Sequence, residues 1–401
     1  MSLDSASDFR SDTVTKPTLA MGQAMLAACV SGETGDDVMR EDLLIGRLES
    51  TIATLLGKAA GVFVPTCTMA NLLAVGAHCG RGDEVLLGSE SHIFVYEQGG
   101  ASFLMGAPMH AIANDPVSGV LPLEALEAAL RMRGGGADCH HPRPALICIE
   151  NTQNRCGGAA LPAAYVDAVA ALARAWGVAL HCDGARLLNA AAALGVPPAA
   201  LAAGCDSVSL CLSKGLGAPL GAVLVGSAAV VERARRLRKA VGGGMRQAGV
   251  VAAAALQALA DHAPGLAADH ARAAAAAAGL RSVPGIAVQP RVDSNIVYFG
   301  LGEAWRVGAW RARAAAARAR GEAAVALPGG ASLPVDALPP AAAAEELPLA
   351  GAFRALLRAQ GVKAGSYGTQ KVRVVTHHQV GDEDVARLVA AARAAGEALT
   401  P

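Results

Sequence analysis

Short apolar runs alternate with longer Ala- and Leu-rich stretches between about residues 60 and 230. The longer stretches have the length of helices, while the short runs are apolar at nearly every position, which is typical of strands buried on both faces. Such strands, separated by helices, predict an α/β fold with a mostly parallel sheet covered on both sides. The runs that predict strands are AAGVFVP, DEVLLG, ALICIE, GVALHCD, CDSVSLCLS and GAVLVG.

The pattern changes after Gly242–Gly244, where Ala/Arg-rich helices are followed by two strand-like runs at 294–300 and 371–377. Two strands with flanking helices predict a smaller α+β domain. Between them, residues 302–350 are rich in Ala, Pro and Gly, and the Pro/Gly-rich half predicts a loop insertion. We therefore predict a large domain over 1–255 and a small C-terminal domain over 256–401.

The charge balance and the cysteines limit which partners and which compartment are expected. Lys+Arg and Asp+Glu both number 34, so the chain has no net positive charge that would attract nucleic acid or an anionic membrane. The Ala-rich run at 271–280 is preceded by Asp269 and His270 and contains Arg272, which argues against a membrane span. The first twelve residues are polar and acidic, unlike a secretory or transit peptide, and the nine Cys show no zinc-type spacing. We expect a cytoplasmic protein with reduced cysteines, no metal, and a small-molecule or protein partner.

Two charged side chains follow neighbouring apolar runs. Asp183 ends one run and Lys214 follows the next, so both are expected at the carboxyl edge of the sheet, where ligands collect. A buried Asp needs a partner, and an ion pair with Arg186 explains Asp183 as well as a catalytic role does. Lys214 lies in a Gly- and Pro-rich turn, where partial burial would make its amine a nucleophile.

A nucleophilic Lys, an Asp fixed opposite it and a phosphate cradle together describe a pyridoxal phosphate site. The stretch FVPTCTMANLL (63–73) turns from a strand through Thr66, Cys67 and Thr68 into a helix, whose first N–H groups could bind a phosphate. Ordinary helix capping explains the same pattern. Together with Asp183 and Lys214, however, it favours the cofactor site.

These residues belong to motifs that resemble the L-threonine aldolases, which are pyridoxal phosphate lyases. The resemblance implies the aspartate aminotransferase fold (fold type I), with a mostly parallel seven-stranded sheet and a smaller C-terminal α+β domain. The motifs, in chain order, are DFRSDTVTKPT (8–18), ETGDDVM (33–39), HIFVYEQGG (92–100), IENT (149–152), HCDGARLLNA (181–190), CDSVSLCLSKGLGAP (205–219), GGGMRQAG (242–249) and VRVVTHH (372–378).

The resemblance assigns cofactor contacts residue by residue. It implies that Lys214 is the Schiff-base lysine, that Asp183 contacts the pyridine nitrogen, and that His92 stacks on the ring. Tyr96, one helical turn after His92, is expected to face the same pocket. The N–H groups of Cys67 and Thr68 are expected to bind the phosphate, with Cys67 standing where many relatives have Gly.

Substrate and subunit contacts follow in the same way. Arg186 is expected near the cofactor and the substrate carboxylate, and Ser11 and Arg373 are expected to complete the carboxylate site. Without the resemblance, Arg373 would be interpreted as a solvent-facing residue of an edge strand. The resemblance implies that Arg246 binds the phosphate of a neighbouring subunit, and hence a homodimer or homotetramer with shared active sites.

The acceptor of the substrate hydroxyl proton is expected in the loop that precedes IENT. This loop reads DCHHPRP, and the family motif falls on His140 or on His141, with His140 slightly favoured. Gln153 stands after IENT, where relatives commonly carry a His that can titrate.

The resemblance implies retro-aldol cleavage of L-threonine or L-allo-threonine to glycine and acetaldehyde, without choosing between the two substrates. One alternative is another lyase or a racemase of this fold, because fold and cofactor do not select the bond that breaks. The other is a non-catalytic scaffold that keeps the fold.

Overall fold

The computed structural model describes residues 6–132, 139–338 and 347–401. They form two compact units, a larger one over Thr15–Ala267 and a smaller one that joins the segment ending at Val14 to Ala268–Pro401. This division differs from the predicted 1–255 and 256–401. The segment before Thr15 belongs with the C-terminal residues because its strand β1 (Ser7–Phe9) pairs in parallel with β13 (Val362–Tyr367).

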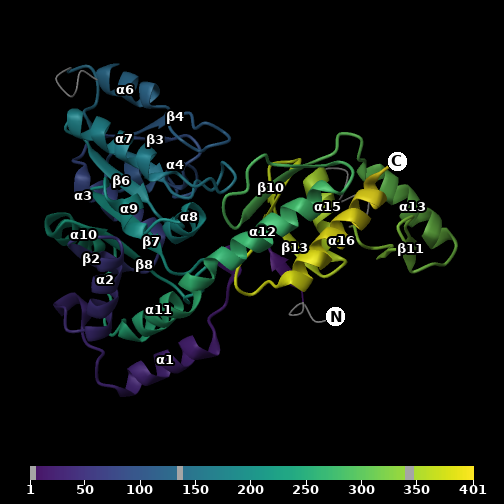
Figure 1. The fold of residues 1–401 in the computed structure, drawn as a ribbon, viewed down its shortest axis with the longest axis horizontal. Coiled ribbons are helices and arrows are strands. Elements are labelled where there is room, and N and C mark those ends of the chain that lie inside the picture. Colours follow the sequence, from purple (N-terminus) through teal and green to yellow (C-terminus); the bar gives the residue numbers. More distant parts are fainter. Residues whose placement is uncertain (1–5, 133–138, 339–346) are drawn as a thin grey trace. The chain divides into compact units, whose positions relative to one another are not determined.

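The larger unit contains a seven-stranded sheet with the order β2–β8–β7–β6–β5–β3–β4 (Figure 1). Strand β8 is antiparallel to both of its neighbours, and the other pairs are parallel. The strands are β2 (Ala60–Val64), β3 (Glu84–Gly88), β4 (Met109–Ile112), β5 (Pro144–Glu150), β6 (Ala179–Asp183), β7 (Ser207–Cys211) and β8 (Ala222–Gly226). The predicted α/β class is confirmed. Strand β4 was not predicted because it is a half-buried edge strand without a continuous apolar run.

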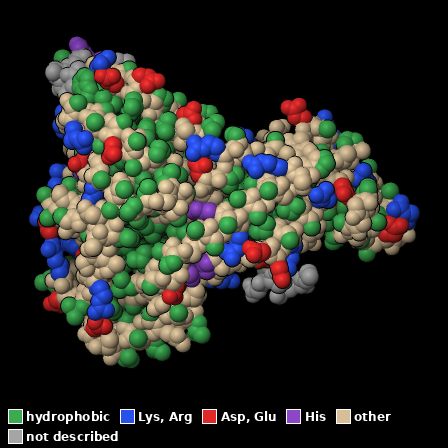
Figure 2. Space-filling model, in the orientation of Figure 1, with side chains coloured by type: hydrophobic (Ala, Val, Ile, Leu, Met, Phe, Trp, Pro, Cys, Tyr) green, Lys and Arg blue, Asp and Glu red, His purple; other side chains and the backbone are tan. Residues whose placement is uncertain are grey.

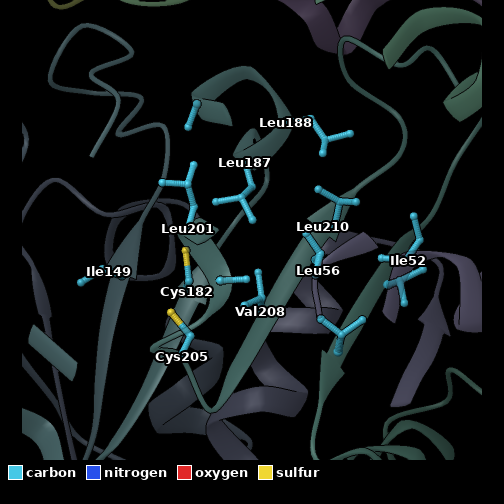
Figure 3. Packing of buried hydrophobic residues seen from close by; sticks show 14 of the residues in the cluster. Ile52, Leu56, Ile149, Cys182, Leu187, Leu188, Leu201, Cys205, Val208 and Leu210 are labelled. Carbon is cyan, nitrogen blue, oxygen red and sulfur yellow. The ribbon is translucent and has the colours of Figure 1, made fainter. Parts of the chain in front are cut away.

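Helices cover both faces of this sheet. Leu86 and Ile147 lie in a core with helices α2 (Leu43–Leu55), α7 (Ala163–Ala175), α8 (Leu187–Leu194) and α11 (Gly249–His262). Their neighbours Val85 and Leu146 face the opposite way, as strand geometry requires, toward α3 (Cys67–His78). Figure 3 shows the first core, where Cys182 and Cys205 lie beside Leu201 and Val208. Both cores hold thiols as small apolar side chains.

The other helices of the larger unit also contribute side chains to its hydrophobic cores. Its other helices are α1 (Leu19–Val30), α4 (His92–Val95), α5 (Gly100–Phe103), α6 (Leu123–Met132), α9 (Pro198–Ala202) and α10 (Ala228–Ala240).

The smaller unit is built on a five-stranded sheet with the order β1–β13–β14–β10–β9. Its further elements are β9 (Ile286–Val288), β10 (Ile296–Leu301), β11 (Ala324–Ala326), β12 (Ser332–Pro334), β14 (Lys371–Val375), α12 (Leu266–Arg281), α13 (Val307–Ala319), α15 (Leu349–Arg358) and α16 (Asp382–Leu399). The predicted insertion near 302–350 holds helix α13 and the β11–β12 hairpin. The loop prediction was therefore wrong for 324–334, where Pro334 ends an isolated hairpin rather than breaking a central strand.

One helix of the described residues, Gly249–Arg281, has the length and apolar composition to cross a membrane. Its small side chains are core residues: Ala252, Ala254 and Ala255 pack in the larger unit, and Ala273 and Ala276 pack in the smaller one. The apolar character of this helix is thus explained by packing within the protein. Figure 2 shows basic and acidic side chains interspersed over the visible face, in keeping with the balanced charge.

Candidate active site

The predicted chemistry gathers at the carboxyl edge of the seven-stranded sheet. Asp183 is the last residue of β6, and Lys214 comes three residues after the end of the adjacent parallel strand β7. Strand β2 runs in the same direction as β7, because both are antiparallel to β8, and it leads into α3 at this same edge. The topology thus brings the Lys, the Asp and a helix N-terminus together.

Lys214 is held by its backbone in a tight turn. Its carbonyl oxygen accepts hydrogen bonds from the Thr15 hydroxyl and from the Gly217 N–H, both at 2.9 Å. Gly217 has φ 78°, a conformation that a residue with a side chain adopts only at a cost. After the hydrogen bond with Cys67, the positive charge of Lys214 adds to the lowering of the Cys211 pKa, and the same charge opposes the rise in the pKa of His92.

Asp183 is 1% exposed, and its carboxylate is satisfied by two donors. The Asn71 amide nitrogen donates to Oδ2 at 2.9 Å, and the Ala185 N–H donates to Oδ1 at 3.1 Å. Asn71 lies on α3 and was not predicted as a site residue. Its amide fixes the orientation of the carboxylate without neutralising its charge.

His92 and Glu97 form a hydrogen-bonded pair at the same edge. The distance between His92 Nδ1 and Glu97 Oε1 is 2.8 Å, and the Asn71 amide donates to that same oxygen at 2.8 Å. Burial lowers the pKa of His92, but the bond to Glu97 and the charge of Asp183 outweigh it, so the pKa lies above its ordinary value. Burial raises the pKa of Glu97, with the charge of Asp183 adding to the rise. The pair can therefore hold a proton next to Asp183.

Two buried polar side chains hold the amide oxygen of Asn71 in place. Its amide oxygen accepts from the Ser209 hydroxyl at 2.7 Å and from His181 Nε2 at 3.1 Å. Burial lowers the pKa of His181 to about 4, so the ring is neutral at pH 7. Because the Ser209 hydroxyl and His181 Nε2 both donate to the amide oxygen, the Asn71 amide nitrogen is the atom that points to Glu97 and Asp183.

The same network bears on metal binding. Ligand atoms of His92, Glu97 and Asp183 lie within 4.8 Å of one another, a spacing that a cation could bridge. The Asn71 amide, however, directs its hydrogens at both carboxylates, where a cation would be repelled. The donor set fits a protonated ring nitrogen beside Asp183 better than a metal ion.

Helix α3 supplies an anion-binding end. Thr66 caps the helix through its hydroxyl, which accepts from the Met69 N–H at 3.1 Å. The N–H groups of Cys67 and Thr68 precede the first intrahelical bond and carry the positive end of the helix dipole, as a phosphate requires. The Cys67 thiol lies 3.6 Å from the Ser209 hydroxyl. Its hydrogen bond to Cys211 is the main cause that lowers the pKa of Cys211 to about 6, with the Lys214 charge adding to it.

Glu150 is the last residue of β5 and lies opposite Asp183 in the sheet. It belongs to the IENT motif but was not predicted as a site residue. Its carboxylate accepts from the His92 N–H at 2.7 Å and from the Asn154 N–H at 3.0 Å, so it fixes the start of α4. Burial, aided by the charge of Asp183, raises the pKa of Glu150 to about 7. This carboxyl therefore changes its protonation near neutral pH.

Replacing Glu150 by Gln is expected to change how stability depends on pH. The pKa of Glu150 is raised from 4.5 to about 7 on folding, so its protonated form stabilises the fold below pH 4.5, and this contribution is lost as the pH rises to about 7. In urea unfolding, the variant should gain about 2–3 kcal/mol relative to the parent protein between pH 5 and pH 8. Glu124→Gln, at an exposed position of α6, is the control, and its difference should not vary with pH. A pH-independent difference for Glu150→Gln would contradict the assignment.

Other predicted residues line the same edge. Arg186, 6% exposed, is the N-cap residue of α8, three residues after Asp183. Tyr96 ends the short helix α4, and its ring centroid lies 5.4 Å from that of His92. Gln153, which replaces a titratable His, is buried and donates to the Glu90 carbonyl at 2.9 Å. In this chain its role is to join two loops.

The structure does not bring His140 or His141 to this edge. Both are exposed and precede Pro144, at the amino end of β5, whereas Glu150 marks the carboxyl end. Seven extended residues span roughly 20 Å, so neither ring reaches the Lys214 site of its own chain. The prediction that one of them takes the substrate proton therefore stays a prediction.

Ser11 and Arg373 belong to the smaller unit, and that unit brings them close together. Arg373 Nη2 donates to the carbonyl of Arg10 at 3.2 Å, next to Ser11, which is buried.

Arg246 belongs to the larger unit, where its largely exposed guanidinium pairs with Asp36 at 2.5 Å. No contact of Arg246 with Lys214 or Asp183 is found among the described residues.

The chain matches the beta-eliminating lyase family over residues 8–301. A probable low-specificity L-threonine aldolase of Arabidopsis thaliana is 48% identical over 304 residues, which cover 75% of this chain and 84% of that protein. The low specificity L-threonine aldolase of Escherichia coli K12 is 42% identical over 299 residues, covering 74% and 85%. The structure of a threonine aldolase of Leishmania major superposes with a TM-score of 0.72 at 18% identity, covering 96% of this chain and 98% of that one.

The structural match supports the fold, while the family match includes the strand ends that carry Asp183 and Lys214 and the N-terminus of α3. The chain therefore belongs to the beta-eliminating lyase family and is homologous to the low-specificity L-threonine aldolases.

Proposed function

We propose that this protein is a pyridoxal phosphate-dependent L-threonine aldolase, a carbon–carbon lyase that cleaves L-threonine and L-allo-threonine to glycine and acetaldehyde. The observation that carries the proposal is the position of Lys214 and Asp183 at the carboxyl ends of two adjacent strands, with a ring nitrogen of His92 within 4.8 Å of the Asp183 carboxylate. The curated relatives named for this activity support it.

The residues at this edge fit the cofactor. Lys214 would bind it covalently, Asp183 would face its ring nitrogen, His92 would stack on its ring, and the first turn of α3 would hold its phosphate. When bound, pyridoxal phosphate supplies the electron sink that stabilises the negative charge left on Cα as the Cα–Cβ bond breaks. The fixed carboxylate of Asp183 keeps that sink effective, because it favours the protonated ring.

Arginine side chains position the amino acid. Arg186, and Arg373 beside Ser11, would bind the substrate carboxylate, since a guanidinium matches a carboxylate with two parallel hydrogen bonds. His92 is the group of this edge best placed to take the β-hydroxyl proton, directly or through water. Its Nδ1 is engaged by Glu97, which fixes the ring and would leave Nε2 to accept the proton. Lys214 then returns a proton to Cα.

The assembly and location extend the same proposal. The exposed guanidinium of Arg246, anchored on Asp36, is suited to reach the phosphate of a neighbouring subunit in a homodimer or homotetramer. The enzyme is expected to act in the cytoplasm, where its nine free cysteines stay reduced.

The function is tested by measuring acetaldehyde with a coupled reductase. Purified protein should release aldehyde from L-threonine and from L-allo-threonine, and the ratio of the two rates gives its stereopreference. Bound cofactor without aldehyde would overturn the aldolase in favour of a racemase or another lyase. Failure to bind the cofactor would overturn both enzymatic alternatives and favour the non-catalytic scaffold.

A further inference from the structure

Arg155, in the loop after β5, contacts Tyr96 at the edge of the site in two ways. Its Nη1 lies 2.9 Å from the Tyr96 hydroxyl, and its guanidinium carbon lies 5.7 Å from the centre of the Tyr96 ring. Tyr96 is 49% exposed, so packing alone does not fix its hydroxyl. The hydrogen bond from Arg155 fixes the Tyr96 hydroxyl instead. Arg155 was not predicted as a site residue.

The direction of this hydrogen bond has a chemical consequence. A guanidinium can only donate, so the Tyr96 oxygen must accept from Arg155. The phenolic hydrogen is then directed to another acceptor. Tyr96 lies beside His92, with 5.4 Å between ring centroids and 48° between ring planes, so that acceptor is expected in the space next to His92.

Arg155 is itself held in place. Its Nε pairs with the carboxylate of Glu90, and its side chain is 22% exposed. Glu90 is fixed by its backbone, because its N–H donates to Asn114 Oδ1 at 3.0 Å and its carbonyl accepts from Gln153 Nε2 at 2.9 Å. Glu90, Arg155 and Tyr96 thus form a chain of contacts that joins the loop after β3 to the loop after β5.

We propose that Arg155 is a positioning residue that makes Tyr96 a hydrogen-bond donor to the β-hydroxyl oxygen of the substrate. A hydroxyl oxygen that accepts from Tyr96 turns its own proton away, toward His92. Arg155 therefore acts through Tyr96 on recognition of the group at Cβ. This inference rests on the proposed aldolase function.

The test is a double-mutant cycle on L-threonine cleavage. Tyr96→Phe and Arg155→Met are each expected to lower kcat/KM about 10-fold, the effect of one lost hydrogen bond to a charged or reacting group. Because Arg155 acts through the Tyr96 hydroxyl, the double variant should lose no more than Tyr96→Phe alone. Arg131→Met is the matched control, since it removes an exposed Arg that pairs with Glu127 on α6, and its activity should equal that of the parent protein.

A second readout separates positioning from a general structural effect. Glycine has no β-hydroxyl, so exchange of its α-hydrogen in heavy water should proceed at the parent rate in Arg155→Met. Multiplicative losses in the double variant, or a parallel loss of glycine exchange, would overturn the inference while parent aldehyde release upholds the aldolase. If the parent protein exchanges glycine but releases no aldehyde, the proposed function fails, and this inference fails with it.

Discussion

Replacing Lys214 by Ala is expected to reduce threonine cleavage by at least about 10³-fold, because it removes the side chain that we propose as the nucleophile binding the cofactor covalently. The variant should also lose the visible absorption band of the bound cofactor. Both changes have the same cause, so they should be seen together in steady-state assays and in the spectrum of the purified protein.

Lys214→Arg is the matched control for charge. The guanidinium keeps the positive charge that helps to lower the pKa of Cys211 and opposes the rise in the pKa of His92, but it does not condense with an aldehyde at neutral pH. This variant should therefore be as inactive as Lys214→Ala while retaining the fold. Turnover close to the parent rate in either variant would refute the role of Lys214.

Replacing Asp183 by Asn is expected to lower kcat/KM by about 10²- to 10³-fold, because breaking a buried ionic contact costs about 3–5 kcal/mol. The side chain keeps its size but only one acceptor oxygen, so either the Asn71 amide or the Ala185 N–H loses its acceptor. The variant therefore loses a negative charge that is 1% exposed together with one hydrogen bond. Steady-state kinetics and a titration with pyridoxal phosphate measure the two consequences, slower cleavage and weaker binding.

Asp206→Asn provides the comparison for this charge. Asp206 precedes β7, at the amino end of the strands, and its carboxylate accepts from the Leu180 N–H at 2.8 Å. The same acid-to-amide change there should leave kcat/KM within about threefold, as expected for a surface change away from the site. Equal losses in both variants would show that the effect of Asp183→Asn is structural rather than electrostatic.

The sheet was predictable because its strands are buried on both faces, which leaves a continuous apolar run in the sequence. All six predicted runs form strands of the seven-stranded sheet. β4 lacked this signal, since three of its four residues are only half-buried. β1 and β13 were missed for another reason: their pairing joins residues about 350 positions apart, which no local pattern reports.

The site was predictable where a charged residue interrupts an apolar run. This signal identified Asp183 and Lys214, and applied to ALICIE it would have identified Glu150 too, since this acid also ends a buried strand. Asn71 and Glu97 carry a weaker signal, because their function depends on a shared hydrogen bond rather than on local sequence. The position of His140 and His141 at the amino end of β5 could not be predicted, because sequence distance to a motif does not report which end of a strand a loop occupies.

The pairing of β1 with β13 bears on the synthesis of the chain. Phe9 is added to the growing chain 355 residues before its partner Ala364, an interval of about 20–70 s at typical elongation rates. Residues 15–267 can complete their own core during that time, whereas β1 has no partner strand until β13 has been made. Until then the backbone of β1 is unpaired and can bind chaperones or neighbouring nascent chains.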